Sequence, residues 1–327
     1  MQLHRREFLA TTSATLGALR GRIEAAQPAG ERNLKWAVSM FLWTSTQWGN
    51  QAPVPYTDML DVIKDTGFDG FRFTGWPGSL EKFNLTIPFL EKELSKRGVR
   101  IATLSFGGPV SDPARHKEVE KSAHEACKFL KTFGATELAV FSPSRPNKVL
   151  VREHMRIACE FYNRLGDICA GYGIKAGLHN HSQGQLVESQ DEIELLLKLT
   201  DPKRFHWAPD TIHLYIAGCN IVQLFEKYAH RLILMDFVDG KYTFAREDLH
   251  VPNGRIEKAG THNATFMLSN KDLGDGEVDL PALTRILKKR RYKGWICVDH
   301  HYAPVSPRHS FTRCMKHIRE KLAPIYA

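Results

Sequence analysis

Several features that would point to a function at once are missing from this chain of 327 residues. None of its six cysteines forms a Cys-x-x-Cys pair, so a zinc knot or disulfide framework lacks its spacing and buried free thiols are favoured. There is no Lys/Arg-rich arm and no nucleic-acid motif. No apolar run is long enough to cross a bilayer, and no Gly-x-Gly-x-x-Gly follows the first predicted strand. These absences argue against a disulfide scaffold, a membrane-spanning protein and an open dinucleotide-binding sheet.

The composition is that of an ordinary globular protein, with 43% hydrophobic and 25% charged residues, and the length can bury one large core. The formal net charge of +9 would by itself suit nucleic acid, an anionic surface or an anionic small substrate. The Lys and Arg residues are scattered, however, over helical stretches such as "EKELSKRG" and "LTRILKKRRYKG". We therefore interpret them as solvated helix faces and expect no nucleic-acid partner.

The first 30 residues have the layout of a signal peptide. A basic start is followed by a modestly apolar run and by small residues near Ala25 and Ala26, and "RREFLA" resembles the twin-arginine export signal. We predict a twin-arginine-type signal peptide over residues 1–30 and a periplasmic or secreted mature protein that is not inserted in the membrane. The alternative interpretation is a frayed basic tail.

Strands and helices alternate from residue 35 to the end of the chain. Apolar runs predict eight strands, at 35–43, 70–76, 99–108, 136–143, 174–179, 204–210, 231–240 and 295–301. Amphipathic stretches predict eight helices, at 56–67, 88–98, 116–134, 153–173, 189–199, 220–230, 279–294 and 309–322. Such alternation implies parallel strands joined by helical crossovers, and eight units are the number in a TIM barrel. We predict an α/β fold, a single-domain (β/α)8 TIM barrel over residues 31–327.

One connection is much longer than the others. Residues 241–272, between the seventh strand and its helix, are polar and contain Gly, Asn and His. A loop of this length is usually functional or mobile. We expect it to lie over the catalytic end of the barrel.

Histidine and aspartate collect at the C-terminal ends of the later strands, where TIM barrels place their active sites. Side chains alternate along a strand, so residues two apart share a face. Apolar neighbours such as Leu178 and Val298 suit the outer face, which helices cover. The side chains predicted to face the interior are therefore His179, His181, Asp236, Asp299 and His301.

Asp210, at the end of the sixth strand, adds a third carboxylate to this group. Carboxylates that converge in a buried site repel one another and cost desolvation energy, and a divalent cation resolves both problems. Imidazole and carboxylate ligands suit manganese, iron, cobalt or zinc, with magnesium less favoured as histidines increase. The alternative is that each Asp caps a helix or binds a loop amide at its own strand end.

Three stretches now carry a family resemblance: "GLHNHSQG", "DTIHLYIAGCNIVQLFEKYAHRLILMDFVDG" and "LGDGEVDLPALTRILKKRRYKGWICVDHHYAP". They resemble the sugar phosphate isomerase/epimerase superfamily, which has a xylose isomerase-like TIM barrel. The pattern is most similar to inosose dehydratases and related keto-sugar epimerases. The resemblance runs from about residue 35 to 320 and is strongest over 174–304.

The resemblance implies one divalent metal ion (Mn, Co, Zn, Fe or Mg), held in the family by Glu, Asp, His and Glu on successive strands. Carried over by motif, the implied ligands in this chain are His179, Asp210, Asp236 and Asp299. The resemblance also implies that His213 contacts substrate hydroxyl groups.

This sequence departs from the family pattern at five places, one of which is Asp236, where the seventh strand usually has His. Family epimerases move a proton with two glutamates, and here those places hold His179 and Asp299. Val238 replaces a family lysine, and Arg72 stands where the second strand usually has Glu. The departures indicate either different chemistry on the same scaffold or loss of the metal.

We therefore predict a metal-dependent isomerase, epimerase or lyase that abstracts a proton next to a carbonyl. The expected substrate is a small carbohydrate, namely a keto sugar, cyclitol or keto-glycoside. His181 and His301 are the predicted catalytic acid–base residues, because a histidine titrates near neutral pH. Arg72 would hold a substrate carboxylate or pair with a neighbouring acid, and Trp76 would stack on a sugar face or pack in the core.

Two other functions are compatible with the sequence. The ligand changes suit an exported, non-catalytic sugar-binding protein with a degenerate metal site. A metal-dependent nuclease on the same barrel would suit the positive charge, but such enzymes need a richer set of His and Glu ligands, and export argues against it. A monomer and a homo-oligomer are both compatible with the sequence.

Overall fold

The computed structural model describes residues 33–46, 54–147, 151–182, 184–251 and 254–327. The signal peptide predicted for residues 1–30 lies outside these ranges. Within them, no helix is long and apolar enough to cross a membrane.

The core of the described chain is a parallel sheet of eight strands, as the alternation predicts. They are β1 (Leu34–Ser39), β2 (Gly70–Phe73), β3 (Arg100–Phe106), β4 (Glu137–Phe141), β5 (Lys175–His179), β6 (Phe205–Trp207), β7 (Leu234–Asp236) and β12 (Gly294–Val298). Their order is β6-β5-β4-β3-β2-β1-β12-β7. Isolated parallel bridges from Trp207 to Leu232 and from Asp210 to Asp236 join the two outermost strands, so the sheet closes almost completely into a barrel.

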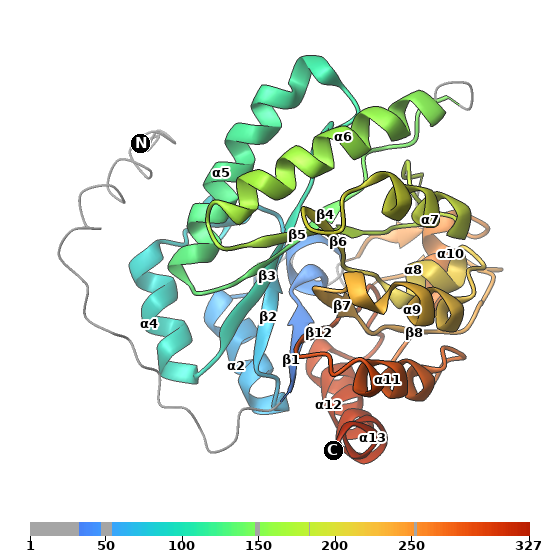
Figure 1. Ribbon diagram of the computed structural model, residues 1–327. Coiled ribbons are helices and arrows are strands. Elements are labelled where there is room, and N and C mark those ends of the chain that lie inside the picture. The colour runs from blue at the N-terminus through green and yellow to red at the C-terminus, as the bar shows by residue number, and fades with distance from the viewer. Residues whose placement is uncertain (1–32, 47–53, 148–150, 183, 252–253) are drawn as a thin grey trace. The chain divides into compact units, whose positions relative to one another are not determined.

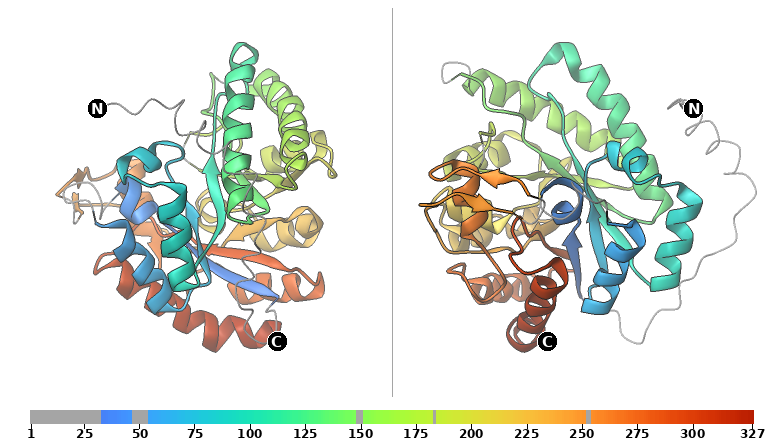
Figure 2. Two further views of the ribbon diagram at one scale, coloured as in Figure 1. Left: turned by 90° about the vertical axis from the view of Figure 1, so that its left-hand side faces the viewer. Right: turned by 180° about the vertical axis from the view of Figure 1, so that it is seen from behind.

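Eight long helices lie outside the strands, which confirms the predicted TIM barrel (Figure 1 and Figure 2). They are α2 (Tyr56–Thr66), α4 (Ile87–Arg97), α5 (His116–Thr132), α6 (Val151–Ala170), α7 (Gln190–Leu199), α9 (Ile221–Tyr228), α11 (Leu280–Lys289) and α12 (Pro307–His317). The other helical elements do not directly link successive barrel strands in the alternating pattern: they are α3 (Gly78–Lys82), α8 (Thr211–Ile216), α10 (His262–Ser269), α13 (Ala323–Tyr326), the 3-10 turns Pro113–Arg115 and Ala229–Arg231, and the π-helical turns Leu42–Thr46 and Ile318–Leu322.

Local chemistry explains where the helices begin and end. Ser189 caps α7 and forms a capping box with Glu192, which satisfies free backbone N–H groups at the helix start. Gly67 ends α2 with a left-handed backbone, at φ 89°, which a glycine adopts without steric cost. Several strands are shorter than predicted: β1 ends at Ser39 because the chain then turns into the π-helical residues Leu42–Thr46.

The hydrophobic residues form two layers. A small interior group fills the barrel with mostly small side chains, namely Ala37, Ala102, Ala139, Ala208, Ile233, Leu234, Trp295 and Cys297. The larger group packs the helices against the outer face of the strands and includes Leu178, Phe237 and Val298. The alternation inferred from the sequence is therefore confirmed at these strands. The interior small residues leave room at the C-terminal end for the polar side chains that follow them.

The long connection after β7 has its own secondary structure. β8 (Asp239–Gly240) pairs antiparallel with β11 (Asn270–Lys271), and β9 (Leu249–His250) pairs with β10 (Ile256–Glu257). Phe266 of α10 lies against the His213 and His301 rings, with centroids 4.6 Å and 5.0 Å apart. The connection therefore covers the C-terminal end of the barrel, as expected from its position.

Asp239 anchors this connection to the following turn. Its carboxylate accepts hydrogen bonds from the N–H groups of Gly240, Gly274, Gly276 and Val278, at 2.9–3.1 Å. A Cβ at position 276 would overlap the Asp239 carboxylate, so glycine is required there. The Gly-x-Gly-Glu-Val-Asp stretch is thus a structural turn that wraps a buried carboxylate.

Candidate functional site

The side chains of the His-Asn-His stretch at the end of β5 have two different roles. The Asn180 side chain donates to the Asp210 carbonyl at 3.3 Å and accepts from the Asp210 N–H at 3.2 Å, so it ties β5 to the end of β6. His179 and His181 lie on the opposite face, with ring centroids 4.9 Å apart. The Nδ1 of His179 lies 3.1 Å from the carbonyl oxygen of Ala208 and must donate to it. Its Nε2 therefore carries the lone pair, which is the form that binds a metal.

Asp210 is held by the start of α8. Its Oδ1 accepts from the N–H groups of Ile212 and His213, at 3.0 Å and 3.4 Å, as an N-cap does. Thr211 exchanges two hydrogen bonds with the backbone of Val238, at 2.7 Å and 2.8 Å, and so fixes α8 to the β7 end. The second oxygen, Asp210 Oδ2, is buried and has no hydrogen-bond partner among the described residues. Both the capping role and the metal role foreseen from the sequence are thus compatible in one carboxylate.

The structure brings the four implied metal ligands together in a fully buried group, which we name the inner cluster. One donor atom from each lies within 4.8 Å of the others, and the members are His179, Asp210, Asp236 and Asp299. His179 Nε2 lies 3.9 Å from Asp210 Oδ2 and 3.8 Å from Asp236 Oδ2. Two ligands that are each about 2.1 Å from one ion lie at most about 4.2 Å apart, so these separations are compatible with a shared ion.

Arg72 of β2 lies beside the inner cluster and is 1% exposed. Its Nη2 donates to Asp236 Oδ1, and its Nη1 donates to Asp299 Oδ2 at 3.2 Å and lies 3.3 Å from His179 Nε2. Of the two roles left open for Arg72, pairing with neighbouring acids is therefore present in the structure. Binding of a substrate carboxylate stays a prediction.

Burial dominates the electrostatics of the inner cluster. It raises the pKa of Asp210 well above its usual value, with further contributions from the negative charges of Asp236 and Asp299. Burial also raises the pKa of Asp236 to about 7, although Arg72 opposes the shift. Burial lowers the pKa of His179, and the positive charge of Arg72 lowers it further. The inner cluster therefore lacks the positive charge that would stabilise its carboxylates in the ionised form.

A divalent cation fits this donor set. Three buried carboxylate oxygens, Asp210 Oδ2, Asp236 Oδ2 and Asp299 Oδ1, have no hydrogen-bond partner among the described residues. An unsatisfied buried acceptor costs about 1–3 kcal/mol, so native structures explain such atoms by a ligand, ion or water. One imidazole and three carboxylates are also the ligand types that the family resemblance implies. Here the imidazole comes from β5, and a carboxylate takes the place of the family histidine at β7.

The predicted catalytic histidines lie directly beside the inner cluster. The His181 ring stacks on that of His213, with centroids 4.2 Å apart, and its buried Nε2 has no hydrogen-bond partner in the described chain. His301 Nε2 lies 3.8 Å from Asp299 Oδ2. Burial lowers the pKa of His301, and it lowers that of His181 to about 3. Both rings are therefore neutral at neutral pH.

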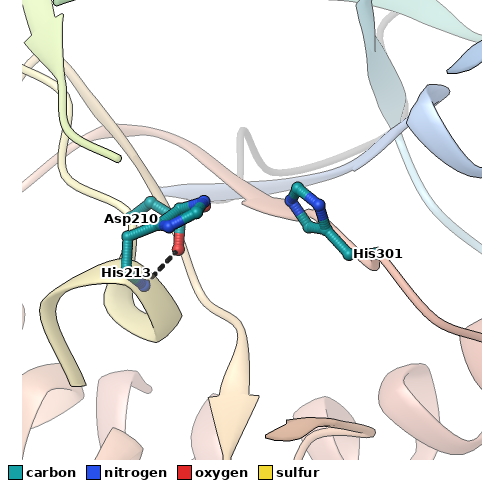
Figure 3. Close-up of side chains that lie close together, drawn as sticks. All are labelled: Asp210, His213 and His301. Atoms are coloured by element: carbon teal, nitrogen blue, oxygen red, sulfur yellow. Dashed lines mark hydrogen bonds between the residues drawn. The ribbon is translucent and has the colours of Figure 1, made fainter. Parts of the chain in front are cut away.

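His213 has the opposite protonation pattern to His179. The N–H of Ser182 donates to His213 Nδ1 at 3.0 Å, so the ring proton must be on Nε2. Figure 3 shows His213 and His301 on either side of the space next to Asp210, a grouping that also has metal-like spacing. The Nε2–H of His213 is a donor and not a ligand, which suits contact with a substrate oxygen. Nothing in the sequence reveals this, because the Ser182 contact depends on the loop conformation.

The ninth predicted site residue, Trp76, lies three residues beyond Phe73, where β2 ends. Its half-buried ring packs on Phe129 of α5 and on Phe73, with centroids 4.8 Å and 6.3 Å apart. These contacts are those of the core-packing role that the sequence left open. A stacking role on sugar stays a prediction.

A second group with metal-ligand spacing, which we name the outer cluster, consists of Asp272, His300 and Cys314. His300 lies between Asp299 and His301, so strand alternation turns its side chain to the opposite face, and this signal was available in the sequence. His300 Nδ1 is 2.9 Å from Asn270 Oδ1, and His300 Nε2 is 3.1 Å from Cys314 Sγ. The site prediction from the sequence did not include this group.

The other cysteines add no further site. All six are free thiols, and five of them are buried, as favoured from the sequence. Burial raises the pKa of Cys314 well above its usual value, so its thiol is not an activated nucleophile.

The family can now be assigned. The family model described as "Xylose isomerase-like TIM barrel" matches residues 60–321. The chain belongs to this family. The resemblance noted in the sequence is thereby confirmed at the level of the family and the fold.

Relatives of this family member are distant in sequence, but the similarity covers most of both chains. An inosose dehydratase of Clostridium beijerinckii is 26% identical over 297 residues, which cover 82% of this chain and 95% of that enzyme. One of Bacillus licheniformis is 28% identical over 290 residues, covering 84% of this chain and 91% of that enzyme.

Solved structures agree on the fold. The IOLI protein with a bound zinc atom superposes with a TM-score of 0.71 at 13% identity, covering 90% of this chain and 99% of that one. The apo 3-keto-D-glucoside 4-epimerase of E. coli gives a TM-score of 0.63 at 17% identity, covering 88% of this chain and 99% of that one. The buried His and Asp residues of the present chain could likewise hold a divalent metal.

Proposed function

We propose that this family member is a metal-dependent enzyme that abstracts a proton next to a carbonyl of a keto sugar, cyclitol or keto-glycoside. The observation that carries the proposal is the inner cluster, with three unpartnered buried carboxylate oxygens and a histidine whose Nε2 lone pair faces them. The inosose dehydratases, the 3-keto-D-glucoside 4-epimerase and the zinc-binding IOLI protein support it as relatives in sequence or fold.

The residues of the site divide the chemistry among them. His179, Asp210, Asp236 and Asp299 would hold the ion. When bound, a divalent ion polarises a carbonyl and an adjacent hydroxyl and so makes the intervening C–H more acidic. The Nε2–H of His213 is available to donate to a substrate oxygen.

His301 is the proposed proton acceptor. Burial keeps its imidazole neutral, and Asp299, 3.8 Å from its Nε2, stabilises the imidazolium that forms when the proton is taken. His181, whose buried Nε2 is without a hydrogen-bond partner in the described chain, is the proposed second acid–base group. Return of the proton to another carbon isomerises the sugar, return to the other face epimerises it, and loss of a β-substituent makes the enzyme a dehydratase or lyase.

Proton exchange with solvent tests the proposal. The protein, loaded with Mn²⁺, Co²⁺ or Zn²⁺, is incubated in D₂O with an inosose, a 3-keto-glucoside and simple keto sugars, and NMR follows deuterium at the carbon next to the carbonyl. We expect exchange into at least one substrate, and a loss of about 100-fold or more in His301→Gln. Exposed His230→Gln is the matched control and should exchange like wild type.

Two other results would change the proposal. Sugar binding without exchange in any substrate would favour the exported, non-catalytic sugar-binding protein. Exchange that is equally fast in His301→Gln and His181→Gln would remove both histidines from the mechanism.

We further propose that residues 1–30 export the protein through the twin-arginine pathway. The proposal rests on "RREFLA" and on the small residues near Ala26, which lie outside the described residues. Fractionation of an expressing bacterium should find the protein in the periplasm or medium with an N-terminus near residues 27–32. Replacement of Arg5 and Arg6 by Lys should retain it in the cytoplasm, and an uncleaved cytoplasmic wild-type protein would contradict the proposal.

A further inference from the structure

Arg72 has a place in the inner cluster that the proposed metal chemistry does not use. It comes from β2, where the family resemblance implies a glutamate, and it is as buried as the four proposed ligands. Its two terminal nitrogens contact Asp236, Asp299 and His179. A cation therefore replaces an acid at the edge of a site that is expected to bind a cation.

The contact with His179 concerns the same electron pair that a metal would need. The His179 Nδ1 donates to the Ala208 carbonyl, so Nε2 is the acceptor, and Arg72 Nη1 lies 3.3 Å from it. A nitrogen lone pair that accepts a guanidinium N–H cannot at the same time coordinate an ion. Arg72 and a metal ion thus compete for His179.

Unlike His179, the carboxylates of the inner cluster keep oxygen atoms that Arg72 does not occupy. Arg72 binds one oxygen of Asp236 and one of Asp299, and the other oxygen of each has no hydrogen-bond partner in the described chain. The Oδ2 of Asp210 likewise has no hydrogen-bond partner among the described residues. Arg72 therefore leaves three oxygen ligands available and occupies the single nitrogen ligand.

The charges of the inner cluster also indicate that Arg72 competes with a metal ion. With all three carboxylates ionised, as ligands of a metal ion are, the carboxylates and the guanidinium around a neutral imidazole sum to −2, which one divalent ion neutralises. Without Arg72 the sum would be −3, and the repulsion between the guanidinium and a nearby metal ion would be absent. Burial lowers the pKa of Arg72, but Asp236 and Asp299 outweigh it and keep this arginine charged.

We propose that Arg72 is a positioning residue that holds Asp236 and Asp299 together and sets the metal preference of the inner cluster. By engaging His179 it shifts the site towards ions that accept oxygen ligands, such as Mn²⁺, and away from Zn²⁺, which imidazole suits. This inference rests on the proposed function, because it assumes that the inner cluster binds a divalent metal.

The test compares metal affinities by calorimetry in wild type, Arg72→Gln and Arg72→Lys, with Zn²⁺ and Mn²⁺ as probes. In Arg72→Gln we expect Zn²⁺ to bind at least about tenfold tighter and Mn²⁺ to change less, so that the Zn²⁺/Mn²⁺ affinity ratio rises. Arg72→Lys keeps the charge but cannot span three partners, and its ratio should rise as well, with a smaller gain in Zn²⁺ affinity.

Arg97→Gln is the matched control. Arg97 is also a buried arginine between two acids, Asp61 of α2 and Glu93 of α4, but it lies at the end of α4, outside the barrel. Its replacement should leave both affinities unchanged, whereas a similar rise there would contradict a local role for Arg72.

The remaining outcomes are also decisive. An Arg72→Gln protein that folds only when Zn²⁺ is added supports the inference, because the ion then supplies the missing counter-charge. An unchanged or lower Zn²⁺/Mn²⁺ ratio in the Gln and Lys variants, or proteins that stay unfolded in Zn²⁺, would overturn it and leave the proposed function intact. If wild type binds neither ion, the proposed function fails and the inference with it.

Discussion

Two groups of similar residues lie on opposite sides of one strand end, and they differ in how far their polar atoms are already hydrogen-bonded. Asp299 and His301 turn into the barrel, where Asp299 belongs to the inner cluster and His301 lies beside it, whereas His300, between them, turns outward to Asp272 and Cys314. Both groups are buried and both have the spacing of metal ligands.

Hydrogen bonding separates the two groups. In the outer cluster, His300 contacts Asn270 and Cys314, the Cys314 sulfur accepts from the Leu273 N–H at 3.3 Å, and Asp272 accepts from Arg313 at 2.8 Å. In the inner cluster, three carboxylate oxygens are without a hydrogen-bond partner among the described residues. A buried polar group that is already satisfied stabilises the fold, and one that is not indicates a missing partner. Ligand spacing alone does not distinguish the two cases.

The largest difference between the clusters should be seen on removing an inner carboxylate. Asp210→Asn keeps the α8 cap, because Asn caps helices as well as Asp does, but removes a charged metal ligand. Loss of a charged ligand should cost at least as much as loss of a supporting residue, so we expect Zn²⁺ affinity to fall by about 100-fold or more. Calorimetry measures it, and an affinity within threefold of wild type would contradict the assignment.

Metal removal should affect only the inner cluster. An ion present at about 100 times its Kd stabilises the folded protein by about 2.7 kcal/mol, so EDTA should lower the wild-type free energy of unfolding by about that amount. Urea denaturation with and without EDTA measures the difference. The same treatment should hardly change Asp210→Asn, and an equal loss in both proteins would place the ion elsewhere.

The outer cluster should matter for stability and not for metal. Cys314→Ala leaves the Leu273 N–H and the His300 Nε2 without their sulfur partner, at a cost of about 2 kcal/mol. Urea denaturation should show this loss, while calorimetry should find the wild-type Zn²⁺ affinity. A stable variant with weakened Zn²⁺ binding would reverse the comparison.

A smaller effect should appear in the pH dependence of stability. Burial holds the pKa of His300 below the usual value of about 6.5, so below that pH the unfolded chain takes up a proton that the folded chain does not. The contribution of His300 to the stability of the metal-free protein should therefore fall as the pH drops from 7 to 5. His300→Gln should reduce the slope by up to about 1.4 kcal/mol per pH unit, whereas Cys314→Ala, which retains the histidine, should not.

Urea titrations at pH 7, 6 and 5 measure these slopes. An identical slope in wild type and His300→Gln would show that His300 is protonated in the folded protein. The outer cluster would then not be the satisfied, neutral group that the hydrogen bonds indicate.

The fold was predictable because barrel strands alternate in a simple way. Leu178 and Val298 indicated the outer face, and His179 and Asp299 therefore the interior. The helix α8 was missed, since its six residues follow β6 directly and are too few to show a helical period. Strand ends were also predicted too long, because apolar residues such as Trp43 continue past β1 into a π-helical turn.

The site was less accessible to sequence reasoning than the fold. Convergence of His179 with Asp210 follows from strand position and parity, and the structure brings them together. The contacts of Arg72 depend on three other strands, and the protonation of His213 depends on the Ser182 amide in a loop. Neither periodicity nor spacing encodes such contacts. The roles of the individual site residues stay predictions.

The most direct test of the account is a crystal structure of the Zn²⁺-soaked protein with anomalous scattering measured at the zinc edge. We expect an anomalous peak within about 2.0–2.3 Å of at least three side chains of the inner cluster, and none at the outer cluster. A peak at Cys314 and His300 alone, or no peak at the inner cluster under saturating zinc, would contradict it.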